Sequence, residues 1–234
     1  MDKKEFISYM KYKAVVFDMD GVIFDSERLV LECWAQIAQA KGIKRMDEVF
    51  HQCIGTNMIK TKEILLENYG EDFPFDEFRT EASILFHSRY DNGRLPMKTG
   101  IKELLSYLKE KGIKIGLASS TRYEVVHQEL QDAGILCYFQ SLTCGDMVKK
   151  SKPEAEIFLK ACERLCVRPE EAIAIEDSFN GIRSAYRAGM LTIMVPDMIA
   201  PNEEMEQLAG KICQDLLEVK EWLEQEILNS VIIK

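Results

Sequence analysis

The chain has 234 residues, 47% of them hydrophobic, which is enough for one α/β domain with an insertion. Its formal net charge is −9 and it has no run of Lys or Arg, so neither nucleic acid nor an anionic membrane surface is an expected partner. No apolar stretch reaches the roughly 18 residues of a membrane span, and residues 1–13 lack the apolar core of a signal peptide. We expect a cytoplasmic protein, and nothing indicates an obligatory protein partner.

The first predicted element is a buried strand, the apolar run Ala14-Val15-Val16-Phe17. Asp18 and Asp20 follow it directly, and Gly21 permits a sharp turn after them. Open α/β sheets bind their ligands at the carboxyl ends of the strands, so both carboxylates are predicted to lie at that edge. Taken alone, such a pair is equally consistent with an ordinary turn, because Asp is common in loops.

A helical insertion is predicted next. Helical spacing covers Leu29–Ala40, Ile59–Tyr69 and Asp76–Tyr90. A crossover between parallel strands takes about 30 residues, whereas roughly 80 separate the first strand from the helix at Gly100. We therefore predict a helical cap domain over residues 27–95, inserted into a core domain made of residues 1–26 and 96–234. Two roles stay open: a lid that closes over a substrate and excludes water, or a rigid addition to the core.

From residue 100 onward, predicted strands and helices alternate. Short apolar runs predict strands, and apolar residues at helical spacing predict the helices between them. The strands are expected at Ile113–Ala118, Leu142–Cys144, Ala172–Ile175 and Leu191–Val195, and the helices at Gly100–Lys111, Glu124–Ala133, Pro153–Cys166, Asn180–Ala188 and Leu216–Leu228. This alternation predicts right-handed crossovers. The expected fold class is α/β, a doubly wound, Rossmann-like parallel sheet with an inserted all-helical cap.

A second pair of acids, Glu176 and Asp177, ends another apolar run. If the two acid-bearing strands are neighbours, up to four carboxylates meet, and two of them about 4 Å apart would repel by roughly 4 kcal/mol at an effective dielectric of about 20. Such a cluster requires a cation or shared protons. Oxygen ligands that also bridge to phosphate favour Mg²⁺.

Polar residues at two further strand ends suggest an anion site. Ser119, Ser120 and Thr121 lie between a predicted strand and a helix, where hydroxyls and free N–H groups bind anions. Lys152 precedes Pro153, which suits a first helical turn. Helix capping and an ordinary surface charge are the alternatives for these two groups.

These segments closely resemble the four motifs of the haloacid dehalogenase-like hydrolase superfamily, in the same order and at similar spacing. The matching segments are Asp18-Met19-Asp20-Gly21-Val22 with Asp25-Ser26-Glu27, Leu117-Ala118-Ser119-Ser120, Ser151-Lys152-Pro153, and Glu176-Asp177-Ser178 with Gly181-Ile182. The insertion after the first motif is similar to that of the subfamily that contains β-phosphoglucomutase and many small-molecule phosphatases.

The resemblance implies a role for each motif residue. Asp18 would be the nucleophile that forms an aspartyl-phosphate, and Asp20 would be the general acid and then the base. The resemblance also implies ligands for Mg²⁺ and for the phosphoryl group. The metal would bind the carboxylates of Asp18 and Asp177, the carbonyl of Asp20 and, directly or through water, Glu176; the phosphoryl oxygens would bind Ser119, the backbone of Ser120 and Lys152.

We expect a Mg²⁺-dependent phosphatase acting on a small phosphorylated metabolite, a sugar or polyol phosphate. The alternative is a mutase of the β-phosphoglucomutase type, but such mutases carry a His where this chain has Leu29 and Val30, and an Arg where it has Gly55-Thr56-Asn57-Met58. Dehalogenases typically lack the second acid. A non-catalytic phosphometabolite-binding relative would be expected to have lost Asp18 or Asp20, and both are present.

Substrate selection is expected to depend on the cap. The polar candidates there and at its hinge are Asn57, Lys60, Arg89 and Arg94. Charged residues on helices are usually just solvated, which is the alternative for each of them.

Overall fold

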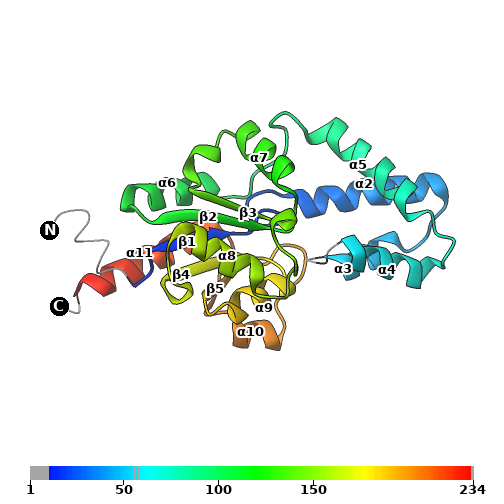
Figure 1. The fold of residues 1–234 in the computed structure, drawn as a ribbon. Helices are drawn as coiled ribbons and strands as arrows, with labels where there is room; N and C mark the ends of the chain where they lie inside the picture. The colour runs from blue at the N-terminus through cyan, green and yellow to red at the C-terminus, as the bar shows by residue number, and fades with distance from the viewer. Residues whose placement is uncertain (1–10, 55, 57, 233–234) are drawn as a thin grey trace.

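The computed structural model describes residues 11–54, 56 and 58–232, which contain a six-stranded parallel sheet (Figure 1). The strands lie in the order β3-β2-β1-β4-β5-β6, and every neighbouring pair is parallel. Their bounds are β1 (Ala14–Phe17), β2 (Lys114–Ser119), β3 (Ser141–Cys144), β4 (Ala172–Glu176), β5 (Leu191–Met194) and β6 (Lys211–Ile212). The order confirms the predicted doubly wound, Rossmann-like sheet.

Both faces of the sheet are covered by helices, as Figure 1 shows. In β1, Val15 and Phe17 join an apolar cluster with α6 (Ile101–Lys111), α7 (Tyr123–Asp132) and α11 (Leu216–Ile232). The alternate residues, Ala14 and Val16, pack with α8 (Glu156–Leu165) and α9 (Phe179–Arg187) on the other face. All four side chains are fully buried, which is why this strand is a continuous apolar run rather than an alternating one.

The inserted helices pack around an apolar cluster of their own. They are α2 (Ser26–Lys41), α3 (Met46–Cys53), α4 (Met58–Tyr69) and α5 (Phe75–Tyr90), and they extend from one end of the sheet, at the right of Figure 1. Trp34 lies at the centre, with its ring edge-on to Phe50 at 5.1 Å and to Phe78 at 5.3 Å between centroids. On this ground we propose that residues 27–95 form the cap domain and that residues 1–26 and 96–234 form the core.

The two connections between the sheet region and the inserted helices run side by side. The N–H of Asp25 donates to the carbonyl of Pro96 at 3.0 Å, and the N–H of Lys98 donates to that of Ile23 at 2.8 Å. The Lys98 ammonium also pairs with Asp197, in the loop after β5, at 2.6 Å. The chain therefore leaves and re-enters the sheet region at one place, close to the end of β1.

The structure shifts the starts of two predicted helices, α2 to Ser26 and α8 to Glu156, and adds several short elements. Helix α8 begins at Glu156 rather than at Pro153, because the Glu156 carboxylate accepts hydrogen bonds from the N–H groups of Lys149 and Lys150 at 2.9 Å and holds the preceding segment as a loop. Helix α3, helix α10 (Glu203–Leu208) and strand β6 were not predicted. They are too short for periodicity to reveal them.

All seven cysteines are free thiols, and five of them are buried. Cys137 and Cys166 are exposed. Among the described residues, none of the helices has both the length and the apolar character that crossing a bilayer requires.

Candidate active site

Acidic residues from β1 and β4 meet at the point where the strand order reverses. β1 and β4 are neighbours, and the N–H of Asp18 donates to the carbonyl of Ile175 at 2.9 Å. This register places Asp18 beside Glu176 and Asp177, and one carboxylate oxygen from each of the three lies within 4.8 Å of the others. All three residues are buried. The carboxyl edge at such a reversal is where open α/β sheets bind ligands.

Two glycines make room for these acids. Gly21 has a φ of +77°, and a Cβ at this position would lie 2.2 Å from Oδ2 of Asp177. A Cβ on Gly181 would lie 1.9 Å from Cδ of Glu176. Neither position has space for a side chain, so both glycines of the sequence motifs are explained by close approach to a carboxylate.

Lys152 lies inside the acidic cluster. Its ammonium donates to the Asp18 carboxylate, to Oε1 of Glu176 at 2.5 Å and to the carbonyl of Ala118 at 3.0 Å. Burial alone would lower the pKa of Lys152, but the two adjacent carboxylates outweigh it and raise the pKa above its ordinary value. Lys152 is therefore cationic across the physiological range.

One ammonium does not neutralise the cluster. Burial, together with the negative charges of Glu176 and Asp20, raises the pKa of Asp18 to about 8, against the opposing charge of Lys152. Burial, followed by the charge of Glu27, raises the pKa of Asp177 well above its ordinary value. Buried oxygen donors that hold protons so tightly are suited to a hard divalent cation, which would favour their ionised forms. The donor set therefore fits Mg²⁺.

The carboxylate of Asp20 is held by two hydroxyl groups. Ser26, at the start of α2, donates to Oδ1 at 2.6 Å, and Thr121, after β2, donates to Oδ2 at 3.1 Å. The sequence predicts Thr121 in a possible anion site and indicates no separate role for Ser26. Its bond to Asp20 could not be read from spacing, because the start of a helix is also where a Ser serves as an ordinary cap.

The predicted phosphate-binding residues take up different positions. Ser120 and Lys152 line a pocket, together with Thr121. Ser119 is fully buried and does not line that pocket, and its Oγ accepts a hydrogen bond from the N–H of Thr121 at 3.0 Å. Ser119 thus shapes the loop that presents Ser120 and Thr121.

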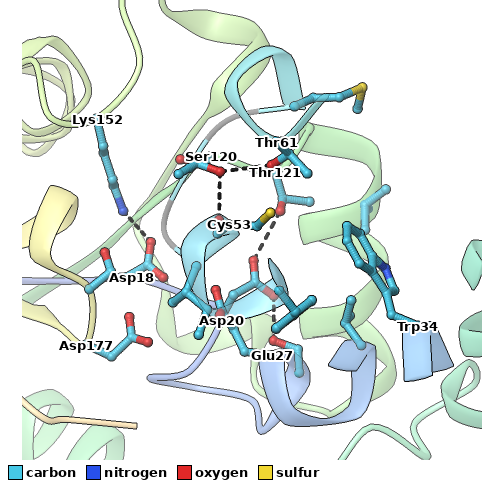
Figure 2. A pocket seen from close by; sticks show the side chains of 18 of the residues that line it. Asp18, Asp20, Glu27, Trp34, Cys53, Thr61, Ser120, Thr121, Lys152 and Asp177 are labelled. Carbon is cyan, nitrogen blue, oxygen red and sulfur yellow. Dashed lines mark hydrogen bonds and ion pairs between the residues drawn. The ribbon is translucent and has the colours of Figure 1, made fainter. Parts of the chain in front are cut away.

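The pocket has a volume of about 480 Å³ and two contrasting walls. Figure 2 shows Asp18, Lys152 and Asp177 on one side and Trp34 on the other, with Asp20 and Glu27 between them. The wall that comes from residues 27–95 is mainly apolar: Glu27, Thr56 and Thr61 are its polar members, and the others are Val30, Trp34, Phe50, Cys53, Ile54 and Met58. A ligand in this pocket would place a charged end on the acids and Lys152 and a less polar end on this wall.

The polar residues predicted for substrate selection do not form this wall. Arg89 donates to Gln36 at 2.6 Å, and Arg94 donates to backbone carbonyls, and neither lines the pocket. Lys60 pairs with a glutamate at 3.0 Å and lines a neighbouring hollow. Asn57 lies outside the described residues.

Two acids near the pocket were not assigned any chemistry from the sequence. Glu27 lines the pocket, and its buried Oε2 accepts no hydrogen bond from the described residues. Burial, then the negative charges of Asp20 and Asp18, raises the pKa of Glu27 to about 8. Oδ2 of Asp197 is likewise buried without a described partner. The one available signal for Asp197 was its place just after a predicted strand.

Known proteins similar to this chain in sequence or in structure include phosphatases and β-phosphoglucomutases. Residues 15–195 match a family model described as haloacid dehalogenase-like hydrolase. A phosphorylated carbohydrates phosphatase of Thermotoga maritima is 32% identical over 178 residues, 76% of this chain and 82% of its own. A β-phosphoglucomutase of Bacillus subtilis is 31% identical over 191 residues, 78% of this chain and 83% of its own. The crystal structure of β-phosphoglucomutase from Clostridium difficile matches with a TM-score of 0.76 at 26% identity, covering 95% of this chain and all 100% of that chain.

Proposed function

The chain belongs to the haloacid dehalogenase-like hydrolase family, and we propose that it is a Mg²⁺-dependent phosphatase acting on a small sugar or polyol phosphate. The observation that carries the proposal is the meeting of Asp18, Lys152, Glu176 and Asp177 at one end of a pocket, with Asp20 held beside them. This set offers a nucleophile, a fixed cation, oxygen donors for a metal and a separate acid, which together suit phosphoryl transfer.

In the proposed first step, an oxygen of Asp18 attacks phosphorus, and the bond from phosphorus to the leaving oxygen breaks. Asp20 gives its proton to that oxygen, which leaves as an alcohol. In the second step, water attacks the aspartyl-phosphate, Asp20 takes a proton from the water, and the bond from phosphorus to Asp18 breaks. Inorganic phosphate is released, and both aspartates return to their starting states. The hydroxyls of Ser26 and Thr121 orient Asp20 for both transfers.

Lys152 and the loop of Ser120 would hold the phosphoryl oxygens, and Ser119 supports that loop through its hydrogen bond to Thr121. A Mg²⁺ ion held by the carboxylates of Asp18, Asp177 and Glu176 and the carbonyl of Asp20 would supply positive charge against the phosphate. Fixed positive charge favours the transition state, because the attacking carboxylate and the phosphate are both anionic.

Purified protein is expected to release phosphate from p-nitrophenyl phosphate only when Mg²⁺ is present. EDTA should abolish the reaction, because the buried acids then retain protons, and an excess of Mg²⁺ should restore it. The rate is followed by absorbance of the released nitrophenolate, with a phosphate assay as a second readout. Inactivity toward a panel of phosphomonoesters with Mg²⁺ present would count against the proposal.

A mutase is the second candidate, because β-phosphoglucomutases are among the relatives. The residues at the position of the mutase His do not favour mutase activity. Leu29 is buried in the main apolar cluster, and Val30 adds an apolar surface to the pocket. Without an imidazole here, nothing is expected to delay attack by water on the aspartyl-phosphate.

We therefore expect net phosphate release from sugar phosphates and little interconversion of β-glucose 1-phosphate and glucose 6-phosphate. A ³¹P NMR time course with Mg²⁺ and a trace of bisphosphate measures both processes in one sample. Rapid isomerisation with negligible inorganic phosphate would replace the phosphatase by the mutase.

A further inference from the structure

A second hollow adjoins the active-site pocket and is lined mainly by cations. It has a volume of about 390 Å³, and Thr56 and Lys152 line both cavities. Three further lysines line the hollow: Lys60 on α4, and Lys149 and Lys150 in the loop before α8. We call these three residues the lysine rim. The rim is therefore built from both the inserted helices and the sheet region, beside the pocket that contains the acidic cluster.

Neighbouring acids do not cancel the charge of the rim. Among the described residues, Glu154 is the one acid that lines the hollow, and its carboxylate pairs with Arg187 at 3.5 Å. Lys60 pairs with a glutamate at 3.0 Å. Within the part of the chain that the structure describes, the side chains of Lys149 and Lys150 form no ion pair, and both are exposed. The hollow therefore keeps a net positive charge.

Lys149 and Lys150 are held in place by their backbone. Their N–H groups donate to the carboxylate of Glu156, in the first turn of α8, at 2.9 Å each. A different side chain at either position would keep this N–H group, so the loop does not depend on the two ammonium groups. Adjacent ammonium groups also repel each other. Their positive charge is therefore available to an anion from the solution.

The rest of the molecule repels such an anion. The chain has a formal net charge of −9. The active-site pocket is lined by more acids than cations: the acids are Asp18, Asp20, Glu27 and Asp177, and the cations are Lys152 and Arg122. The charge of Lys152 is already shared between two buried carboxylates. Positive charge near the mouth of a site raises the local concentration of an anionic ligand and its rate of association.

We propose that the lysine rim attracts phosphate esters to the active-site pocket by charge. This inference rests on the proposed phosphatase function, because it assigns the rim to the same site. The ligand is the phosphate group itself, which carries nearly two negative charges near neutral pH. The rim acts on the encounter and takes no part in bond cleavage. It therefore determines kcat/KM and the affinity for phosphate, and it leaves kcat unchanged.

The test compares two pairs of substitutions that alter net charge equally. Lys149→Gln with Lys150→Gln removes two charges from the rim, and Lys149→Arg with Lys150→Arg retains them. Lys102→Gln with Lys109→Gln is the matched control, because both lysines are exposed on α6, on the face of the sheet opposite α8. Lys60 is left in place, since its removal would leave a glutamate without its partner.

Two measurements are made with Mg²⁺ present, at ionic strengths of about 10 mM and about 150 mM. The first is the steady-state hydrolysis of p-nitrophenyl phosphate, which gives kcat and kcat/KM separately. The second is the binding of inorganic phosphate by titration calorimetry, which does not require turnover.

At the lower ionic strength, the Gln double variant of the rim should lose about fivefold or more in kcat/KM, at the low end of electrostatic effects on association. Its affinity for inorganic phosphate should fall by a similar factor, with kcat unchanged. At about 150 mM the loss should shrink to about twofold or less, because the Debye length is then about 8 Å. The Arg double variant and the α6 control should match the wild type at both ionic strengths.

The outcomes separate this inference from the proposed function. If the wild type hydrolyses no phosphate ester, the phosphatase proposal fails, and the binding of inorganic phosphate still decides whether the rim attracts anions. If the wild type neither hydrolyses an ester nor binds phosphate, both proposals fail. If the wild type is active but the Gln double variant keeps its kcat/KM and phosphate affinity at low ionic strength, the role of the rim is rejected while the phosphatase stands.

Three further results would reject attraction by the rim. Equal losses in the rim and α6 double variants would show an effect of net charge alone. A loss that persists at about 150 mM, where exposed charges are largely screened, would not be electrostatic. A reduced kcat, or an equal loss in the Arg double variant, would show that the loop acts through its shape.

Discussion

The Asp18→Asn variant is expected to lose about 10⁴-fold or more in kcat on every phosphate ester. The amide occupies nearly the same volume as the carboxylate but is a far poorer nucleophile and metal ligand. Higher concentrations of substrate or Mg²⁺ should not restore the kcat of this variant. Steady-state rates on p-nitrophenyl phosphate measure this effect, and Asp76→Asn on α5 is the control, because that side chain is 79% exposed.

The same variant should be no less stable than the wild type. Burial raises the pKa of Asp18 to about 8 from an ordinary 3.8, so the folded protein binds this proton more tightly than the unfolded chain does. The group's contribution to stability therefore declines as the pH rises from about 4 to about 8. In EDTA, the gain of the variant over the wild type should be larger at pH 8 than at pH 5. Thermal unfolding of both proteins at the two pH values measures this difference in stability. Separately, wild-type activity in the variant would reject the role of Asp18 as the nucleophile.

The sheet was predictable because both of its faces are covered. Val15 and Phe17 pack on one face while Ala14 and Val16 pack on the other, so the strand appears in the sequence as an unbroken apolar run with an acid after it. β4 shows the same pattern before Glu176. Elements that lack this signal were missed: β6 spans two residues at the edge of the sheet, and α3 is only 8 residues long.

The charged groups of the site were predictable from their places after strands, but their hydrogen bonds were not. Thr121 reaches Asp20 across 101 positions in the chain, and Ser26 reaches it across 6. Either hydroxyl could equally have capped a helix, and only the tertiary arrangement that brings the start of α2 and the loop after β2 to Asp20 decides between the two roles. Bonds of this kind depend on tertiary structure, which no local pattern contains.

The wall opposite the acids was the hardest part to predict. Polar residues such as Arg89 and Arg94 were the candidates for substrate selection, whereas Val30 and Trp34 line the pocket. Helical spacing shows that these apolar residues share a face of α2, but that face would be equally apolar if it only packed against neighbouring helices. Trp34 in fact does both, since it also lies in the cluster of α2 to α5.

Replacing Lys152 by Met is expected to reduce kcat by about 10³-fold or more. The side chain keeps its length but loses the cation that contacts Asp18 and Glu176, so the developing charge on the phosphate loses a fixed partner. The charge of Lys152 also lowers the pKa of Asp18. Without it, that pKa rises further above about 8, and less of the nucleophile is ionised at pH 7.

This variant should also be destabilised, in contrast to Asp18→Asn. Removing one partner of a buried ion pair typically costs about 3–5 kcal/mol. The loss of unfolding free energy should be larger at pH 8 than at pH 5, because protonation of the carboxylates left without a cation relieves their repulsion at lower pH. Urea unfolding in EDTA at the two pH values measures this free energy. Lys160→Met is the control. Among the described residues, the ammonium of Lys160 donates only to a backbone carbonyl, that of Met147, at 2.6 Å. Equal losses of stability in the two lysine variants, or an unchanged kcat in Lys152→Met, would contradict the central place of Lys152 in the acidic cluster.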